Sequence, residues 1–189
     1  MDYTEIFGAA TGLLYVLLEI KQRKLMWIVG GLSALVYTVI FFKSSLYAAM
    51  LIQVYFIFAS IYGWIIWNKS SGNNGEEQQV RRPLSILKIV ISIILTGIIF
   101  LTIRYMLSTW SFDPMPDTDA LVASLSILAT YWVSHKYIYH WIIWIIANVI
   151  AIYMYSSQGL YVTAVLYFVY TIAAVAGFLE WRKFSKVLN

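Results

Sequence analysis

Apolar residues dominate the chain in seven long runs, and short polar segments separate these runs. A helix needs about 20 apolar residues to cross the hydrocarbon core of a bilayer. The polar stretch 68–83 is typical of a flexible linker, and Pro114 and Pro116 prevent the fourth helix from continuing. The pattern predicts an all-α integral membrane protein with seven transmembrane helices, near residues 5–20, 25–42, 46–67, 84–107, 118–134, 139–155 and 160–181.

Composition supports the membrane setting. Hydrophobic residues make up 61% of the chain and charged residues 12%, with a mean hydropathy of +0.76. This is too apolar for a soluble domain of 189 residues. The absence of cysteine excludes disulfides, thiolate metal sites and thiol nucleophiles. Aromatic residues reach 17%, more than two interfacial belts need, so some are expected to line a pore or a pocket.

Lysine and arginine indicate the orientation of the helices. With seven spans, the loops after the first, third and fifth helices share one side with the C-terminus. Basic residues favour the cytoplasmic side, so the N-terminus is predicted outside and the C-terminus in the cytoplasm. The net charge of +4 is then an orientation signal and calls for no nucleic-acid partner. Only Lys43 and Arg104 fall on the outer side, against eleven residues on the inner side: Lys21, Arg23, Lys24, Lys69, Arg81, Arg82, Lys88, Lys136, Arg182, Lys183 and Lys186.

An internal repeat relates the two ends of the chain at an offset of 114, the difference between 141 and 27. The rarest matches are Trp27 with Trp141, Gly63 with Gly177 and Trp67 with Trp181. We interpret residues 1–67 as one three-helix repeat and 118–189 as a second, with a basic cytoplasmic tail. Residues 68–117 then hold a cytoplasmic linker, the fourth helix and an external loop. Parallel repeats of this kind place a substrate site between the halves, near the midplane.

The sixth helix carries the candidate site. Trp141, Trp144 and Asn148 are spaced i, i+3 and i+7, so two indoles and an amide share one helix face. Gln53 lies in the middle of the third helix, where an amide must face protein or water rather than lipid. Two other roles stay open, since Trp141 also suits an interfacial belt and both amides also suit hydrogen bonds between helices.

The repeats differ where a binding site would need them to differ. Trp144 stands where the first repeat has Gly30, and Asn148 stands where it has Ala34. Gln53 in turn corresponds to a tyrosine of the second repeat. A duplication that served only architecture would not require this asymmetry, whereas a site for an asymmetric molecule does.

Nothing in the sequence indicates an enzyme. No nucleophile–base pair, metal-ligand cluster or cofactor motif can be assembled from the apolar helices, so no catalytic residue, metal or cofactor is expected. Glu19 stands at a helix end beside Lys21, and we interpret it as a solvated interfacial carboxylate. Asp117 or Thr118 is predicted to cap the fifth helix.

Two sequence blocks resemble the PnuC family of bacterial vitamin transporters. One, within residues 53–64, contains Gln-Val-Tyr-Phe and Ile-Tyr-Gly-Trp, and the other is Trp-x-x-Trp-x-x-x-Asn at residues 141–148. The resemblance implies a full-length SWEET-like fold of three plus one plus three helices, assembled as a homotrimer in the bacterial inner membrane. It also implies facilitated diffusion of nicotinamide riboside, which a cytoplasmic kinase phosphorylates and so traps.

By matching position, the resemblance assigns substrate binding to Gln53, Trp141, Trp144 and Asn148, with Tyr170 as a further candidate. The last helix departs from the pattern of many nicotinamide riboside carriers, which have an asparagine before the glycine. Here the residues are Val-Ala-Gly at positions 175–177. Relatives within the family carry thiamine or riboflavin.

Two alternatives stay open. Nicotinamide riboside and thiamine both carry a permanent positive charge, and a cation gains about 0.5–2 kcal/mol from each aromatic face that it contacts. Two tryptophans and two amides suit either vitamin, so a thiamine transporter is the alternative within the family. A membrane receptor that binds its ligand without passing it is the alternative from another class, and liposome uptake distinguishes the two.

Overall fold

The computed structural model describes residues 3–43, 47–70, 84–110 and 114–185, and every regular element in these ranges is a helix. Each helix begins and ends within four residues of its predicted position. Of the predicted linker at 68–83, residues 68–70 belong to the third helix and residues 71–83 lie outside the described residues. The helices are α1 (Tyr3–Ile20), α2 (Leu25–Lys43), α3 (Tyr47–Ser70), α4 (Ile86–Trp110), α5 (Pro116–Ser134), α6 (His140–Ser157) and α7 (Tyr161–Ser185).

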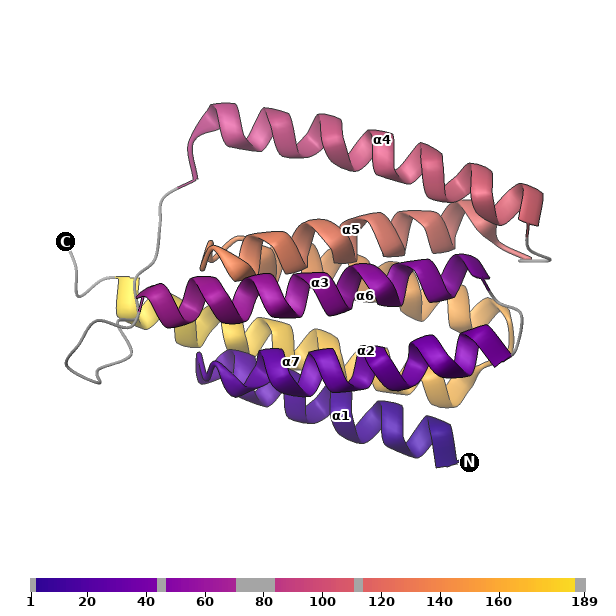
Figure 1. Cartoon of the computed structure of the whole chain (residues 1–189), viewed down its shortest axis with the longest axis horizontal. Coiled ribbons are helices and arrows are strands. Elements are labelled where there is room, and N and C mark those ends of the chain that lie inside the picture. Colours follow the sequence, from indigo (N-terminus) through magenta and orange to yellow (C-terminus); the bar gives the residue numbers. More distant parts are fainter. Residues whose placement is uncertain (1–2, 44–46, 71–83, 111–113, 186–189) are drawn as a thin grey trace.

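Length and hydropathy mark five described helices as candidate membrane spans: α2, α3, α4, α6 and α7. The apolar part of α1, Ile6–Ile20, is shorter. The start of α1 and the end of α7 lie at opposite ends of the bundle (Figure 1). A polytopic helical membrane protein is therefore confirmed.

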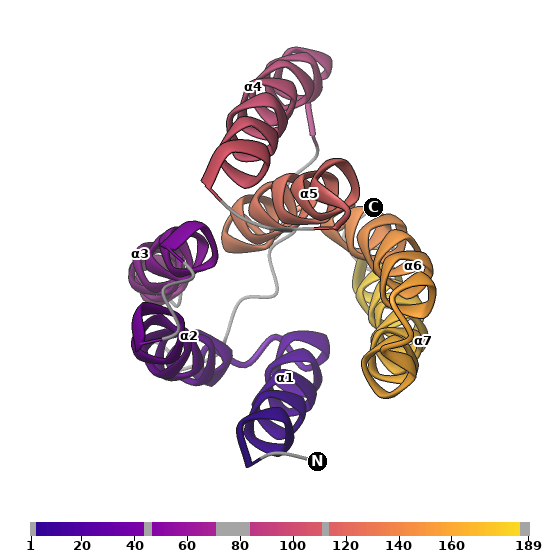
Figure 2. The same cartoon turned by 90° about the vertical axis from the view of Figure 1, so that its right-hand side faces the viewer.

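Six of the helices form a closed ring. Contacts run from α1 to α2, α3, α5, α6, α7 and back to α1, and the end-on view shows the ring directly (Figure 2). α4 stands outside it, against α5 and, more lightly, α3. Trp132 Nε1 on α5 donates to Ser92 Oγ on α4 at 3.2 Å, and Lys88 Nζ on α4 donates to the Tyr137 hydroxyl at 3.1 Å.

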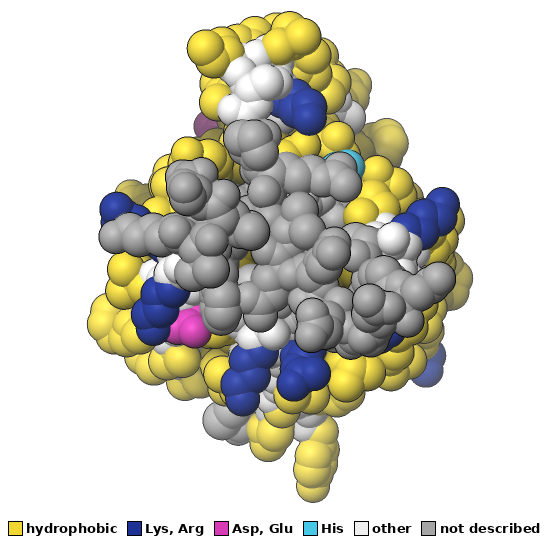
Figure 3. Space-filling model, turned by 90° about the vertical axis from the view of Figure 1, so that its left-hand side faces the viewer, with side chains coloured by type: hydrophobic (Ala, Val, Ile, Leu, Met, Phe, Trp, Pro, Cys, Tyr) yellow, Lys and Arg dark blue, Asp and Glu magenta, His cyan; other side chains and the backbone are white. Residues whose placement is uncertain are grey.

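Large side chains are buried where helices of the ring pack together and exposed on α4 outside it. Trp27, Trp141 and Trp181 are at most 2% exposed, whereas Ile93 and Leu101 on α4 are at least 60% exposed. An apolar outer face of this kind suits contact with lipid. One end of the bundle carries a rim of Lys and Arg side chains (Figure 3).

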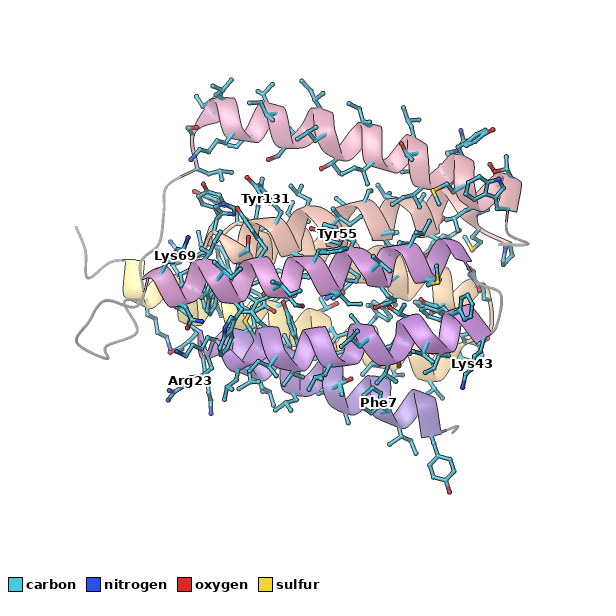
Figure 4. All side chains as sticks on the ribbon, viewed as in Figure 1. Phe7, Arg23, Lys43, Tyr55, Lys69 and Tyr131 are labelled. Carbon is cyan, nitrogen blue, oxygen red and sulfur yellow. The ribbon has the colours of Figure 1, made fainter. Side chains whose placement is uncertain are left out.

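The labelled side chains show the two ends of the bundle. Arg23 and Lys69 lie at the end with the basic rim, and Lys43 lies at the opposite end (Figure 4). Between the ends, Tyr55 on α3 donates a hydrogen bond to the backbone carbonyl of Ile127 on α5 at 3.0 Å. This bond ties α3 to α5 within the ring.

Two turns of the same type end α1 and α5. Gln22 and Lys136 have φ values of 52° and 57°, the left-handed conformation that often stops a helix. Arg23 N donates to the Leu18 carbonyl at 2.8 Å, and Tyr137 N donates to the Trp132 carbonyl at 3.0 Å. Every residue of the second turn lies 114 positions after its counterpart in the first.

The predicted cap of the fifth helix is wrong. α5 begins at Pro116, with Met115 at the N-cap position and no side-chain hydrogen bond to the cap. Proline suits the first helical position because its missing N–H would have no partner there. Asp117 therefore lies within the first turn, where it pairs with Arg104 of α4 instead.

Candidate functional site

A tryptophan lies against a glycine between α2 and α3. A Cβ atom on Gly63 would come within 2.4 Å of the Trp27 indole, so this approach requires glycine. Trp67, one turn further along α3, meets Trp27 edge-on, with ring centroids 5.8 Å apart and planes at 86°. The two indoles and the glycine together pack α2 against α3.

The same junction occurs between α6 and α7. A Cβ atom on Gly177 would come within 2.5 Å of Trp141. Trp141 and Trp181 also meet edge-on, at 5.8 Å and 85°. Each of these residues lies 114 positions after its counterpart in the first junction, so the two pairs of helices pack in the same way.

At the end with the basic rim, tryptophan hydrogen bonds join two groups of three helices, α1–α3 and α5–α7. Trp67 Nε1 on α3 donates to the backbone carbonyl of Ser134, the last residue of α5, at 3.1 Å. Trp181 Nε1 on α7 donates to the backbone carbonyl of Ile20, the last residue of α1, at 3.2 Å. The third helix of each group is thus tied to the first helix of the other.

Two cavities meet at Trp144. Cavity A, of about 200 Å³, is lined mainly by α1, α2 and α3, and cavity B, of about 270 Å³, mainly by α1, α6 and α7. Trp144, Tyr15 and Phe56 line both. Each cavity alone is smaller than the roughly 300–1,000 Å³ of a typical ligand pocket. Together they form one interior site that aromatic side chains divide.

Many residues in the walls of the two cavities correspond at the offset of 114. Where cavity A has Gly30 and Ala34, cavity B has Trp144 and Asn148. At these two positions, the α6 wall of cavity B is therefore more aromatic and more polar than the α2 wall of cavity A. Positions 27, 30, 34, 53, 56 and 60 line cavity A, and the positions 114 residues later, 141, 144, 148, 167, 170 and 174, line cavity B.

The structure brings the five predicted binding residues to this one interior site. Trp141, Trp144, Asn148 and Tyr170 line cavity B, and Gln53 lines cavity A. The i, i+3, i+7 spacing on α6 places the first three in one wall. Trp141 is fully buried in its junction with Gly177, whereas Trp144 borders both cavities.

Indole N–H groups at this site lack acceptors. Nε1 of Trp27, Trp141 and Trp144 is buried with no hydrogen-bond partner among the described residues. A buried donor without an acceptor costs about 1–3 kcal/mol, so such groups are usually found where a ligand or water completes them. Of these three tryptophans, Trp144 is the one that borders both cavities.

The interpretation of Glu19 as a solvated carboxylate is wrong. Glu19 is 1% exposed and lines cavity B. Its Oε1 lies 3.0 Å from Nε2 of His140, which is fully buried. Among the described residues that line the two cavities, Glu19 carries the formal charge, and no lysine or arginine is present.

His140 is held in place through its other ring nitrogen. Nδ1 of His140 lies 2.6 Å from the backbone carbonyl of Tyr137, which only accepts, so this nitrogen donates to it. The Nε2 side of the ring therefore faces the Glu19 carboxylate at 3.0 Å, and no hydrogen bond joins these two atoms.

The repeat already contained a signal for this pair. At the offset of 114, Glu19 corresponds to Val133, and His140 corresponds to Met26. Two polar residues thus replace two apolar ones at matched positions in the two groups of helices. A polar residue of one repeat that corresponds to an apolar residue of the other is therefore the sequence signal for both.

Comparison with known proteins places the chain among vitamin transporters. Residues 2–183 match the model of the family described as nicotinamide mononucleotide transporter. The nicotinamide riboside transporter PnuC of Escherichia coli (strain K12) is 26% identical over 204 residues, which cover 96% of this chain and 85% of the relative. The protein of the same name from Shigella flexneri matches to the same extent.

A solved structure shares the fold. The crystal structure of the vitamin B3 transporter PnuC superposes with a TM-score of 0.74 at 19% sequence identity. The match covers 97% of this chain and 82% of the other. The helical arrangement described above is therefore that of a known transporter.

Proposed function

The chain belongs to the nicotinamide mononucleotide transporter family, and from this membership we propose that it carries nicotinamide riboside by facilitated diffusion across a bacterial inner membrane. It is a multi-pass membrane transporter of a small vitamin and not an enzyme. One observation supports the choice of substrate: the wall of cavity B holds both the Trp144 ring, whose N–H has no acceptor, and the carboxyl group of Glu19.

Charge favours the riboside over the mononucleotide. Proteins bind phosphate with arginine, lysine or the N-terminus of a helix. No lysine or arginine lines cavity A or B among the described residues, and Glu19 would repel a phosphate. Nicotinamide riboside has a positively charged ring and no phosphate, so it suits these walls. The relatives from Escherichia coli and Shigella flexneri are named for the riboside as well.

The five residues divide the task of binding. Trp144 stacks on the cationic ring, an interaction of about 0.5–2 kcal/mol at each aromatic face. Asn148 in cavity B and Gln53 in cavity A lie on the two sides of this indole, where they hydrogen-bond the carboxamide and the ribose hydroxyls. Trp141 and Tyr170 form the remaining wall of cavity B.

The transport cycle uses the two groups of three helices as moving halves. We infer a SWEET-like arrangement of three plus one plus three transmembrane helices, with α1–α3 and α5–α7 as parallel repeats and α4 as the connector. The matched Trp–Gly–Trp junctions and matched turns support this repeat. The halves rock about the interior site and expose it to either side in turn.

Direction and assembly follow from the same proposal. The end with the basic rim faces the cytoplasm, as basic loops do, and the N-terminus faces outward. A cytoplasmic kinase then phosphorylates the vitamin, and the charged product cannot return. Lipid surrounds the outer face, and three copies form the homotrimer that the resemblance implies.

Uptake into proteoliposomes tests the proposal. The purified protein is expected to equilibrate radiolabelled nicotinamide riboside without any ion gradient, and nicotinamide mononucleotide is expected neither to enter nor to compete. Thiamine and riboflavin are compared at the same concentrations. Uptake of thiamine but not of the riboside would assign the protein to thiamine, and binding without uptake would identify a receptor.

A further inference from the structure

The Glu19–His140 pair connects two helices that are not neighbours in the ring. α1 contacts α2 and α7, and α6 contacts α5 and α7. Trp181 of α7 stands between them: its Nε1 donates to the Glu19 carbonyl at 3.2 Å, and its ring meets the His140 ring edge-on at 4.8 Å. The pair therefore lies inside the ring, next to cavity B.

The fold itself does not require a polar pair here. The corresponding positions, Val133 and Met26, are apolar and fully buried in one cluster. A buried ion pair often stabilises a protein no more than well-packed apolar residues of similar size. Because the matching junction between α2 and α5 closes without charge, Glu19 and His140 call for a functional explanation.

The carboxylate of Glu19 is incompletely satisfied. Its Oε1 lies close to His140 Nε2 but is not aligned for a hydrogen bond, and both atoms lack any other partner among the described residues. A buried carboxylate normally accepts several hydrogen bonds or pairs with a cation. Glu19 lies on the same face of α1 as Gly12 and Tyr15, and this face forms a wall of cavity B.

We propose that Glu19 selects a cationic substrate: its carboxylate pairs with the positively charged ring in cavity B, and with His140 when the cavity is empty. The assignment rests on the proposed function, because it requires a substrate with a positive charge. The attraction acts in an interior from which water is largely excluded, where charges interact more strongly than in water. His140 and the substrate then compete for one carboxylate.

A comparison of two ligands tests this role. Nicotinamide riboside is positively charged, whereas its 1,4-dihydro form keeps the ribose and the carboxamide but carries no charge. Quenching of tryptophan fluorescence in detergent gives the dissociation constant of each. We expect the wild-type protein to bind the cation at least about tenfold more tightly than the neutral form, since charged partners add that much.

The variant Glu19→Gln keeps the size of the side chain and removes its charge. Binding of the cation should weaken until the two ligands differ by no more than about twofold, while binding of the neutral form stays within about threefold of wild type. A loss of folding would weaken both ligands equally. The ratio of the two constants therefore reports charge recognition and not stability.

Two further variants keep the test decisive. His140→Met leaves Glu19 without its competitor, so the preference for the cation should persist or increase. The double variant Glu19→Val with His140→Met copies the Val133 and Met26 pair that already packs at the matching junction between α5 and α2. It should fold, as judged by its elution profile and melting temperature, and should lose the preference for the cation.

The outcomes separate the two proposals. A wild-type protein that binds neither form of the riboside overturns the proposed function and this inference with it. A wild-type protein that binds both forms equally overturns the inference alone. The inference alone is also overturned if Glu19→Gln or the double variant prefers the cation as strongly as the wild type does.

Discussion

Gly177 and Trp141 touch so closely that a Cβ atom on the glycine would fall 2.5 Å from the indole ring. Trp141 is fully buried, so the ring has no room to withdraw. We expect Gly177→Ala to destabilise the protein by about 1–3 kcal/mol, the usual cost of overpacking a core. A lower melting temperature in detergent measures the effect.

Gly97 on α4 is the matched control, because no described atom beyond its own turn of helix lies within 4 Å of the Cβ that alanine would add there. Gly97→Ala should leave the melting temperature unchanged or raise it slightly, since alanine favours a helix over glycine by about 1 kcal/mol. Equal melting temperatures for the two variants would contradict the close contact at Gly177.

Trp144 provides both an aromatic face and an N–H group to the interior site, and two variants separate them. Trp144→Phe keeps the face and loses the donor, so the affinity for nicotinamide riboside should fall about tenfold. Trp144→Ala loses both the face and the donor, so the affinity for nicotinamide riboside should fall about 100-fold or more. Isothermal titration in detergent measures each constant. Trp110→Ala, at an exposed indole on α4, should bind like the wild type.

Asn148 should matter for binding because its amide lines cavity B. Asn148→Ala is expected to weaken binding about tenfold, the cost of one hydrogen bond to a ligand that stays buried. Asn68 offers a control outside the cavities, where its Oδ1 accepts a hydrogen bond from Lys24 at 3.1 Å. If Asn68→Ala and Asn148→Ala weaken binding alike, the amide of Asn148 has no specific role.

The orientation of the chain can be read with single cysteines, because the sequence contains none. Lys43 and Lys21 are both exposed. Arg23, two residues after Lys21, lies at the opposite end of the bundle from Lys43 (Figure 4). In intact spheroplasts, a membrane-impermeant maleimide should label Lys43→Cys, at the outer end, and should not reach Lys21→Cys. Lys21→Cys should be labelled only after the spheroplasts are lysed. The reverse pattern would place the basic rim outside.

The helices were predictable because the thickness of a bilayer sets the length of an apolar run. The start of α5 was not, because capping depends on local backbone geometry. Asp117 had two possible partners: the end of its own helix and Arg104 of α4, 13 residues before it. The chain folds so that Arg104 is within reach, and no local pattern contains that information.

The interior site was predictable only in part. The spacing of Trp141, Trp144 and Asn148 predicted one wall, and their binding roles stay predictions. Glu19 was missed because it ends an apolar run beside basic residues, where water is expected. Trp181, 162 residues away along the chain, covers that helix end in the folded protein. Burial of a helix end by a distant segment leaves no trace in the local sequence.

α4 stands outside the ring that the other six helices close. Two identical three-helix polypeptides would need no such helix, because the bonds from Trp67 to Ser134 and from Trp181 to Ile20 are the same contact made twice. In a single chain that holds both groups of helices, matched positions can carry different residues. Trp144 borders both cavities, whereas the matched position holds Gly30. A symmetric dimer of one three-helix polypeptide would have to carry the same residue at both positions.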